Sequence, residues 1–168
     1  GGVMALIDRL ARLFEERRVP YQVIPHREAF TAEAVAQVSH VARRHVAKAV
    51  VIRSGVSDYL MCVLPASEHL DLETVRRVTG RHVIEFAAEG ELKRLFPDCE
   101  VGAMPPFGSL YGIPTCLDAC FFRELEDEMY FQAGNHHEIV RIAFEDYRRS
   151  AGPFAHEACL HERHRVAV

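Results

Sequence analysis

Apolar side chains recur near the start of the chain at the spacing of one helical face. The apolar face consists of Leu6, Leu10, Leu13 and Phe14, and the charged residues Asp8, Arg9, Arg12, Glu15 and Glu16 fill the opposite side. This spacing is typical of an amphipathic helix that packs one side against a core. Pro20 cannot continue such a helix, so the pattern predicts a helix over residues 4–18.

The rest of the chain alternates between helical and strand-like patterns, and Thr31 stands at a helix cap position. Further helices are predicted at 31–40, 71–79, 88–96 and 144–149. Strands are predicted at 21–24, 46–53, 58–64, 82–86, 100–101, 115–118, 129–133 and 138–142. Two pairs of these strands are joined by short glycine-containing turns, which predicts two antiparallel hairpins.

Helices and strands are interleaved, which predicts an α/β fold with one mixed, largely antiparallel sheet surrounded by helices. A length of 168 residues, 49% of them hydrophobic, suits one domain with a single core. We therefore expect one domain over residues 1–168, with its core at about 4–150. Residues 151–168 are charged and rich in histidine, and we expect them to form a partly ordered C-terminal tail.

Composition excludes several classes of protein. The longest apolar runs span only a few residues, too short to cross a membrane, so no membrane partner is expected. A formal net charge of −4 argues against binding of long duplex DNA, and any contact with nucleic acid should be small and local. The five cysteines form no Cys-x-x-Cys motif and no signal segment starts the chain, so we expect a reduced, cytoplasmic protein.

A segment rich in glycine and proline runs from Gly102 to Pro114, between two predicted strands. It holds three glycines and three prolines within thirteen residues. Glycine permits positive φ and a close approach of a ligand to the backbone, whereas proline stiffens the chain. Such a loop can present N–H groups to a ligand oxygen. It can equally be a tight structural connection, and the loop alone leaves both interpretations open.

Lysine is rare in this chain, since only Lys48 and Lys93 are lysines among 20 basic residues. Lys93 lies in a predicted solvated helix face. Lys48 lies on an otherwise apolar strand, where burying an ammonium group is costly unless it is paired or reaches a cavity. A lysine near a strand end can also extend its side chain to water. From the sequence alone, the Lys48 side chain can either face a cavity or reach water at the end of the strand.

Other chemical motifs are weak or missing. The chain has no Gly-x-Gly-x-x-Gly, Gly-Lys-Ser/Thr or Gly-x-Ser-x-Gly motif, which argues against a nucleotide-binding loop or a serine-hydrolase elbow. His136 and His137 are neighbours on a strand and point to opposite faces, so we expect one to face a pocket. Asp118 ends a strand beside the loop, where it can orient water or a substrate ammonium group or be solvated. Cys116 and Cys120 flank it and are interpreted as buried small hydrophobes.

The tail carries a weak metal-binding pattern. Its residues His156, Cys159, His161 and His164 have side chains that suit zinc. No second ligand pair at suitable spacing accompanies them in the sequence. We therefore predict no metal site.

Several features follow one another in a particular order. They are Thr31 before an alanine-rich helix, the strand Ala47-Lys48-Ala49-Val50-Val51, the loop Gly102-x-x-x-Pro106-Phe107-Gly108, and Phe131-x-Ala133-Gly134-Asn135-His136-His137. This arrangement resembles the YbaK family of aminoacyl-tRNA deacylases, which also occurs as the editing domain inserted in bacterial prolyl-tRNA synthetase. The resemblance covers about residues 4–150, nearly the whole chain.

The resemblance implies roles for particular residues. Lys48 matches the family lysine that engages the phosphate or sugar end of the acceptor strand. Gly102, Pro106 and Gly108 match the loop whose backbone groups hold the ester-linked aminoacyl end. The family needs no metal and no cofactor. The free hydroxyl of the terminal ribose assists a bound water that attacks the ester.

The expected substrate site extends beyond the catalytic positions. Further substrate contacts are expected at Thr31, Phe107, Asp118 and His137. The loop departs from the family pattern at residues 103–105, where Ala-Met-Pro replaces the small polar residue that many members carry. This departure bears on the shape of the amino-acid pocket.

The combined expectation is a trans-editing hydrolase that deacylates mischarged aminoacyl-tRNA, with a small amino acid on tRNA-Pro as substrate. Its expected partners are the acceptor end of the tRNA and an aminoacyl-tRNA synthetase. The alternative is a non-catalytic module that binds a tRNA 3′ end, a nucleotide or a synthetase. A third possibility is hydrolysis of a different small ester or amide.

Overall fold

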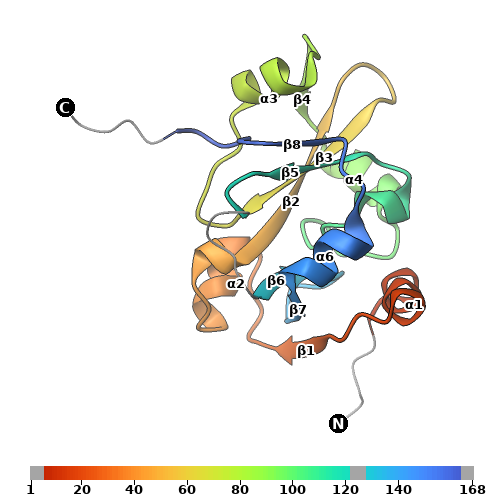
Figure 1. Ribbon diagram of the computed structural model, residues 1–168, viewed down its shortest axis with the longest axis vertical. Helices are drawn as coiled ribbons and strands as arrows, with labels where there is room; N and C mark the ends of the chain where they lie inside the picture. Colours follow the sequence, from red (N-terminus) through yellow and green to blue (C-terminus); the bar gives the residue numbers. More distant parts are fainter. Residues whose placement is uncertain (1–5, 122–127, 164–168) are drawn as a thin grey trace, which may run out of the picture.

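The computed structural model describes residues 6–121 and 128–163, which form one sheet with helices packed against it (Figure 1). The strands are β1 (Gln22–Pro25), β2 (Val46–Arg53), β3 (Tyr59–Pro65), β4 (Glu85–Phe86), β5 (Thr115–Asp118), β6 (Glu128–Gln132), β7 (Glu138–Ala143) and β8 (His156–Ala158). The helices are α1 (Asp8–Arg17), α2 (Ala32–Val38), α3 (Leu72–Thr79), α4 (Glu89–Leu95) and α6 (Phe144–Ala151). Two short 3₁₀ segments, Arg43–His45 and Gly108–Tyr111, connect them.

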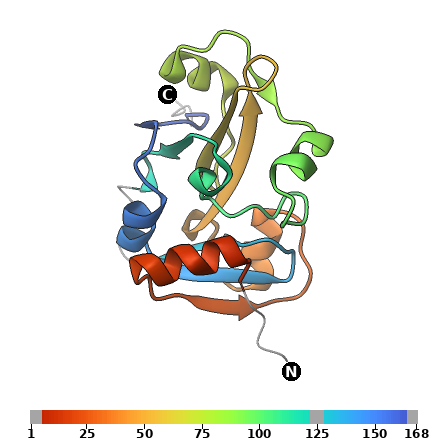
Figure 2. The same cartoon turned by 90° about the vertical axis from the view of Figure 1, so that its right-hand side faces the viewer.

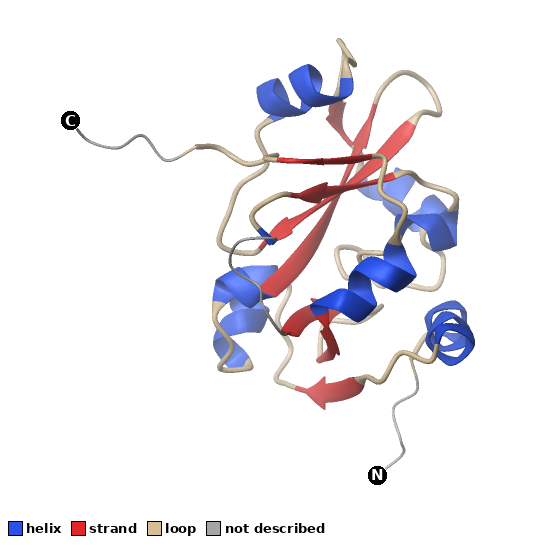
Figure 3. Cartoon of the chain, in the orientation of Figure 1, coloured by secondary structure: helices blue, strands red, loops and turns tan. Residues whose placement is uncertain are grey.

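The eight strands form a mixed sheet in the order β1-β7-β6-β2-β3-β5-β8, with β4 paired to β2 (Figure 3). Antiparallel pairings join β1 to β7, β7 to β6, β2 to β3 and β2 to β4. Parallel pairings join β2 to β6, β3 to β5 and β5 to β8. The predicted α/β class with a mixed sheet is confirmed, as are both hairpins, β2–β3 and β6–β7.

Apolar side chains fill both faces of the sheet. The larger cluster joins α1, α6 and the glycine- and proline-rich loop to the strands, and Leu10, Phe14 and Phe107 are fully buried in it. Figure 2 shows α1, in red, lying over the β6–β7 hairpin, in blue. On β2, Val51 belongs to this cluster while its neighbour Ile52 packs with α3 in another. Neighbouring strand residues point to opposite faces, so α3 covers the other side.

The ends of two helices follow the local signals in the sequence. The hydroxyl oxygen of Thr31 accepts a hydrogen bond from the Ala34 amide at 3.0 Å, which caps α2 as predicted. Gly80 ends α3 with φ at 72°, in the left-handed region that glycine adopts without strain. None of the helices in the described part of the chain is long and apolar enough to cross a membrane.

Two predicted strands differ from the structure. Residues 100–101 form a turn, because the Glu100 amide donates to the Gly134 carbonyl and the Ala103 amide donates back to the Glu100 carbonyl. The strand predicted at 82–86 is reduced to β4, which pairs only with the end of β2. At residues 100–101 a contact with the distant turn at Gly134, which the local pattern does not show, takes the place of strand pairing.

The C-terminal segment is more ordered than its composition indicated. Residues 156–158 form β8, which pairs in parallel with β5, and Leu160 beyond it is fully buried. The expected tail after residue 150 therefore contributes a strand to the sheet over its described part. Its sequence, His156-Glu157-Ala158, has no apolar alternation, so the free edge of β5 and the burial of Leu160 provide the reason for this strand. His164 lies outside the described residues.

Candidate active site

One edge of β2 has two different strand partners, with a gap between them. This edge is paired with β6 at Val46 and Ala47 and with β4 at Ile52 and Arg53, and residues 48–50 lie between these partners. A cavity of ≈ 170 Å³ lies at this position. Its lining consists of Phe30, Thr31, Ala32, Ala47, Lys48, Ala49, Val50, Gly102, Met104 and Gln132. The start of α2, the middle of β2, the loop after α4 and the end of β6 thus converge on one hollow.

Lys48 lies in the middle of β2 and lines the cavity, which settles its position in favour of a cavity rather than a strand end. Burial lowers the pKa of its ammonium group, and the negative charges of Glu33 and Glu68 oppose this shift only in part. A cation that has lost part of its water shell binds an anion more strongly than a fully hydrated one. Lys48 is therefore suited to hold a phosphate group at the cavity.

The loop contributes two residues to the lining of the same cavity. Gly102 has φ at 86°, and a Cβ atom placed there would meet only the His136 Cε1 atom, at 3.7 Å. The glycine is therefore required by the left-handed backbone rather than by lack of space. Gly102 and Met104 both line the cavity, and within residues 6–121 and 128–163 neither of their amides donates a hydrogen bond. These two N–H groups are available to donate hydrogen bonds to a ligand oxygen.

The turn between β6 and β7 holds the loop in place. The Gly134 amide donates to the Ala103 carbonyl at 2.7 Å, and the Glu100 amide donates to the Gly134 carbonyl at 2.8 Å. The His136 amide adds a third bond, to the Glu100 carboxylate at 3.0 Å. Backbone amides fixed in this way are already oriented before a ligand arrives, which is the condition for stabilising developing charge.

The His136 ring is part of this support. A carbonyl oxygen only accepts, so the contact of 2.8 Å between His136 Nε2 and the Val101 oxygen places the ring proton on Nε2. The other nitrogen, Nδ1, then accepts from the Gln132 amide group at 3.3 Å. The Phe30 ring packs against the imidazole with centroids 4.9 Å apart. Both ring nitrogens are thus engaged, and His136 acts as a positioning residue for the loop.

His137 is the histidine that we expected to contact substrate, and the structure places it elsewhere. Its side chain is 45% exposed and lies 3.9 Å from the Glu138 carboxylate, away from the residues that line the cavity. Both histidines lie in the turn before β7 rather than on a strand, and of the two it is His136 that contacts the loop. A contact of His137 with substrate stays a prediction. Only the turn at Gly134 decides which of them faces the loop.

Substitution of the two histidines should separate these roles. We expect His136→Ala to cost about 2 kcal/mol and to lower Tm by about 4–8 °C, because a buried carbonyl and a buried amide lose their partner. Hydrolytic activity should fall with it, since the loop amides are released. His137→Ala should change the free energy of unfolding by less than about 0.5 kcal/mol. Thermal unfolding and activity of both variants measure this, and equal effects would contradict the assignment.

The second half of the loop motif faces the core instead of the cavity. The Pro106 carbonyl accepts from the Tyr147 hydroxyl at 2.7 Å. Phe107 is fully buried and makes edge contacts with the rings of Phe131 and Tyr147. A Cβ atom at Gly108 would collide with Thr115 Oγ1 and with the Ile113 oxygen. These residues, expected to contact substrate, anchor the loop whose other end lines the cavity.

Asp118 is also absent from the cavity lining. Its side chain has no exposed surface and accepts hydrogen bonds from the Cys120 and Leu160 amides, each at 2.9 Å. It is therefore neither a solvated strand end nor a group that faces the cavity. Cys116 beside it is fully buried, as expected, and burial raises the pKa of its thiol to about 11. Cys116 is not among the residues that line the cavity, and a protonated thiol is a poor nucleophile. Cys120, which was also interpreted as buried, is partly exposed.

The sequence therefore located part of the cavity and missed part of it. The predicted residues that meet there are Thr31, Lys48 and Gly102. Phe30 and Gln132 also line the cavity and were not predicted. Met104 was expected only to affect the shape of the pocket, and His136, which packs against Phe30, was one of two candidate histidines. Gln132 could have been identified from the sequence, because it is a polar residue at the end of an apolar strand. The structure shows that it is only 7% exposed.

Comparisons with known proteins place this geometry in context. A sequence profile of the aminoacyl-tRNA editing domain matches residues 26–150. No curated protein matches the chain by sequence.

Solved structures share the fold at low sequence identity. The crystal structure of the hypothetical protein APE2540 has a TM-score of 0.79 and 15% identity, covering 92% of this chain and 100% of that one. A protein described as a candidate trans-editing enzyme for prolyl tRNA synthetase has a TM-score of 0.74 and 20% identity, covering 95% and 100%. A candidate signal transduction protein from Marinobacter aquaeolei VT8 has a TM-score of 0.72 and 19% identity, covering 92% and 31%.

The profile match extends from the residues before α2 to α6 and includes Lys48, Gly102 and the supporting turn at Gly134. It therefore covers the elements that form the cavity and well over half of the chain. The chain belongs to the aminoacyl-tRNA editing domain family.

Proposed function

We propose that this protein hydrolyses the ester bond of a mischarged aminoacyl-tRNA, with a small amino acid on tRNA-Pro as its substrate. Membership of the editing family supports deacylation as the activity. The similarity to a candidate trans-editing enzyme for prolyl tRNA synthetase favours tRNA-Pro as the tRNA and a synthetase as a partner. Such a protein acts in the cytoplasm, where tRNA is charged.

The size and lining of the cavity support a small amino acid. A volume of ≈ 170 Å³ lies well below the roughly 300–1,000 Å³ of pockets that hold drug-sized ligands. Ala47, Ala49, Val50 and Met104 give the wall an apolar surface of short or compact groups. A methyl or hydroxymethyl side chain fits such a space, whereas a large side chain requires displacement of β2 or the loop.

The two loop amides supply the chemical contribution of the protein. Water attacks the carbonyl carbon of the ester, and negative charge develops on the carbonyl oxygen. In our proposal this oxygen accepts hydrogen bonds from the Gly102 and Met104 amides, each donor of this kind contributing about 2.7–4 kcal/mol. The bond from the carbonyl carbon to the ribose oxygen then breaks. That oxygen takes up one proton of the attacking water, the second proton passes to solvent, and the amino acid leaves with a carboxylate group.

Proton removal from the attacking water is assigned to the substrate. Within the described residues that line the cavity, Lys48 is the one side chain with an acidic or basic group, and the His136 ring beside them has both nitrogens engaged. The free hydroxyl of the terminal ribose lies next to the ester in any aminoacyl-tRNA and can orient the water. Lys48 holds a phosphate of the acceptor end, and this fixes the ester against the loop.

The meeting of Lys48 with the Gly102 and Met104 amides at one cavity carries this proposal. A panel of tRNAs tests it: tRNA-Pro charged with alanine, serine, cysteine or proline, and tRNA-Ala charged with alanine. We expect release of a small amino acid from tRNA-Pro by the wild type and by Lys93→Ala, which alters the other lysine on exposed α4. Absence of turnover on every substrate contradicts the proposal, and tRNA binding without turnover supports the non-catalytic alternative.

A further inference from the structure

A second group of reactive side chains lies where β5 and β8 end. These strands are parallel neighbours, with Asp118 opposite Ala158, so their carboxyl ends meet at the same edge of the sheet. Cys120 follows Asp118 by two residues, and His161 follows Ala158 by three. The topology thus brings together residues about forty positions apart in the sequence. None of them lines the cavity at Lys48.

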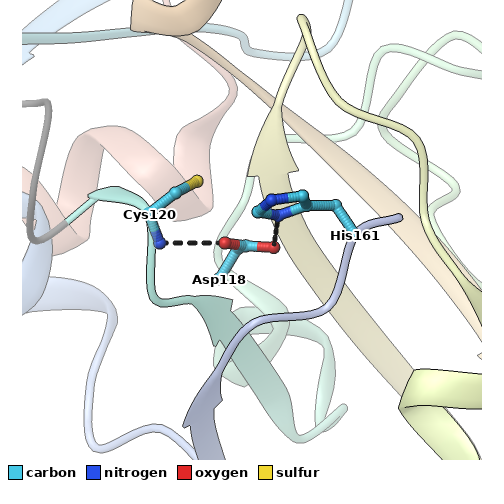
Figure 4. A group of neighbouring side chains, drawn as sticks. All are labelled: Asp118, Cys120 and His161. Atoms are coloured by element: carbon cyan, nitrogen blue, oxygen red, sulfur yellow. Dashed lines mark hydrogen bonds and ion pairs between the residues drawn. The ribbon is translucent and has the colours of Figure 1, made fainter. Parts of the chain in front are cut away.

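The donor atoms of Asp118, Cys120 and His161 all lie within 4.8 Å of one another. Figure 4 shows the Asp118 carboxylate between the Cys120 and His161 side chains. The His161 Nδ1 atom is 2.7 Å from Asp118 Oδ2. The sulfur of Cys159 lies 3.8 Å from each ring nitrogen of His161. One carboxylate, one imidazole and one thiol are therefore gathered in one place, and the Cys159 thiol lies beside the imidazole.

The surroundings of Asp118 are those of a supported metal ligand. Its carboxylate accepts from the Cys120 and Leu160 amides, and these bonds fix its orientation. The His161 side chain is 15% exposed and Cys120 is partly exposed, so an ion can enter although Asp118 itself is fully buried. The charges also balance. A divalent cation with one carboxylate, one thiolate and one neutral imidazole forms a neutral unit, which is favourable at a buried position.

We propose that Asp118, Cys120 and His161 bind one zinc ion, with Cys159 or water in the fourth position. Zinc is favoured over magnesium or calcium because two of the three donors are nitrogen and sulfur. On binding, the Cys120 thiol loses its proton to solvent. The His161 ring proton moves from Nδ1 to Nε2, so that Nδ1 binds the ion beside the Asp118 carboxylate. The ion joins the C-terminal segment to β5. The sequence did not show this site, because Asp118 and Cys120, at the end of β5, are about forty residues away from His161 in the tail.

Metal binding is tested on the full chain without an affinity tag, stripped of metal with a chelator. We expect one zinc ion per chain by elemental analysis after dialysis, and an increase in Tm of several degrees when zinc is added. Cobalt in place of zinc should give the absorption of a tetrahedral thiolate complex. Hydrolytic activity of the folded, stripped protein should equal that of the zinc form, because the cavity at Lys48 is separate.

Variants decide which residues bind the ion. Cys120→Ala and His161→Gln should each weaken zinc binding by at least about 100-fold and abolish the cobalt–thiolate absorption. Cys159→Ala identifies the fourth ligand. Part of the absorption is lost if the Cys159 thiol binds the ion, and the absorption is unchanged if water occupies that position. His156→Ala and Cys99→Ala are the matched controls and should bind as the wild type does. Absence of the cobalt–thiolate absorption in the wild type, or zinc binding that survives both ligand variants, would overturn the proposal.

Discussion

Replacement of Lys48 by alanine is expected to reduce kcat/KM for aminoacyl-tRNA hydrolysis by about 10–100-fold, the effect of losing one hydrogen bond to a charged group. Lys48 lines the cavity next to the loop that carries Gly102 and Met104. Without its ammonium group the acceptor end loses a phosphate contact, and the ester is no longer held against the loop amides. Single-turnover deacylation of mischarged tRNA-Pro measures the loss.

A matched variant separates a role in binding from a role in folding. Lys93→Ala removes the other lysine, whose exposed side chain lies 3.5 Å from Glu89 on the same helix, and should retain full activity. Lys48→Arg should recover only part of the activity, because a planar guanidinium group replaces a compact charge. If Lys48→Ala hydrolyses the substrate at the wild-type rate, Lys48 does not engage the acceptor end.

Removal of the Lys48 ammonium group is also expected to raise the stability of the folded protein. The pKa of this group is lowered in the folded protein, so the unfolded chain binds the proton more tightly and the protonated form opposes folding. This cost is fully present below the folded-state pKa and declines as the pH rises from that pKa towards the unfolded-state value. Lys48→Met should therefore unfold at the same or a higher temperature than the wild type at neutral pH, while it hydrolyses tRNA poorly. A gain that grows as the pH is raised would contradict this assignment.

Gly108→Ala is expected to be the most damaging small substitution in the loop, at about 3 kcal/mol of stability and about 6–12 °C in Tm. The new methyl group would lie 2.5 Å from the backbone oxygen of Ile113 and would collide with Thr115 on β5. A backbone atom cannot turn aside as a flexible side chain does. The loop or β5 has to move, and with it the aromatic packing of Phe107.

Two other glycines provide the comparison. Gly112 lies in the same loop with φ at 68°, but a Cβ atom there would have no described atom within 4 Å, so Gly112→Ala should cost only the backbone strain of about 1 kcal/mol. Gly90 lies within α4 in open space, and Gly90→Ala should stabilise the protein by up to about 1 kcal/mol. Chemical denaturation of the three variants gives the order. A Gly108 variant as stable as the Gly112 variant would show that the loop is not packed as described.

Local patterns determined most of the helices and strands. Leu10 and Phe14 specify the buried face of α1, Thr31 caps α2, and Gly80 ends α3, because each of these effects acts within one or two turns of chain. The hairpins followed from short turns between apolar segments. The strand at 100–101 was predicted wrongly and β8 was not predicted, since the backbone partners of these segments, Gly134 and β5, are distant in sequence.

The sequence by itself determined the fold class and the two ends of the candidate site, Lys48 and Gly102. A lone lysine on an apolar strand and a glycine in a stiff loop are unusual enough to be noticed without a structure. Only the tertiary structure decided which neighbours join them. It turned His136 towards the loop and His137 away, buried Phe107 and Gly108 in the core, and carried Asp118 to the end of β8 beside His161. The physical reason is that side-chain direction and strand order depend on backbone pairings between distant residues, which no local pattern encodes.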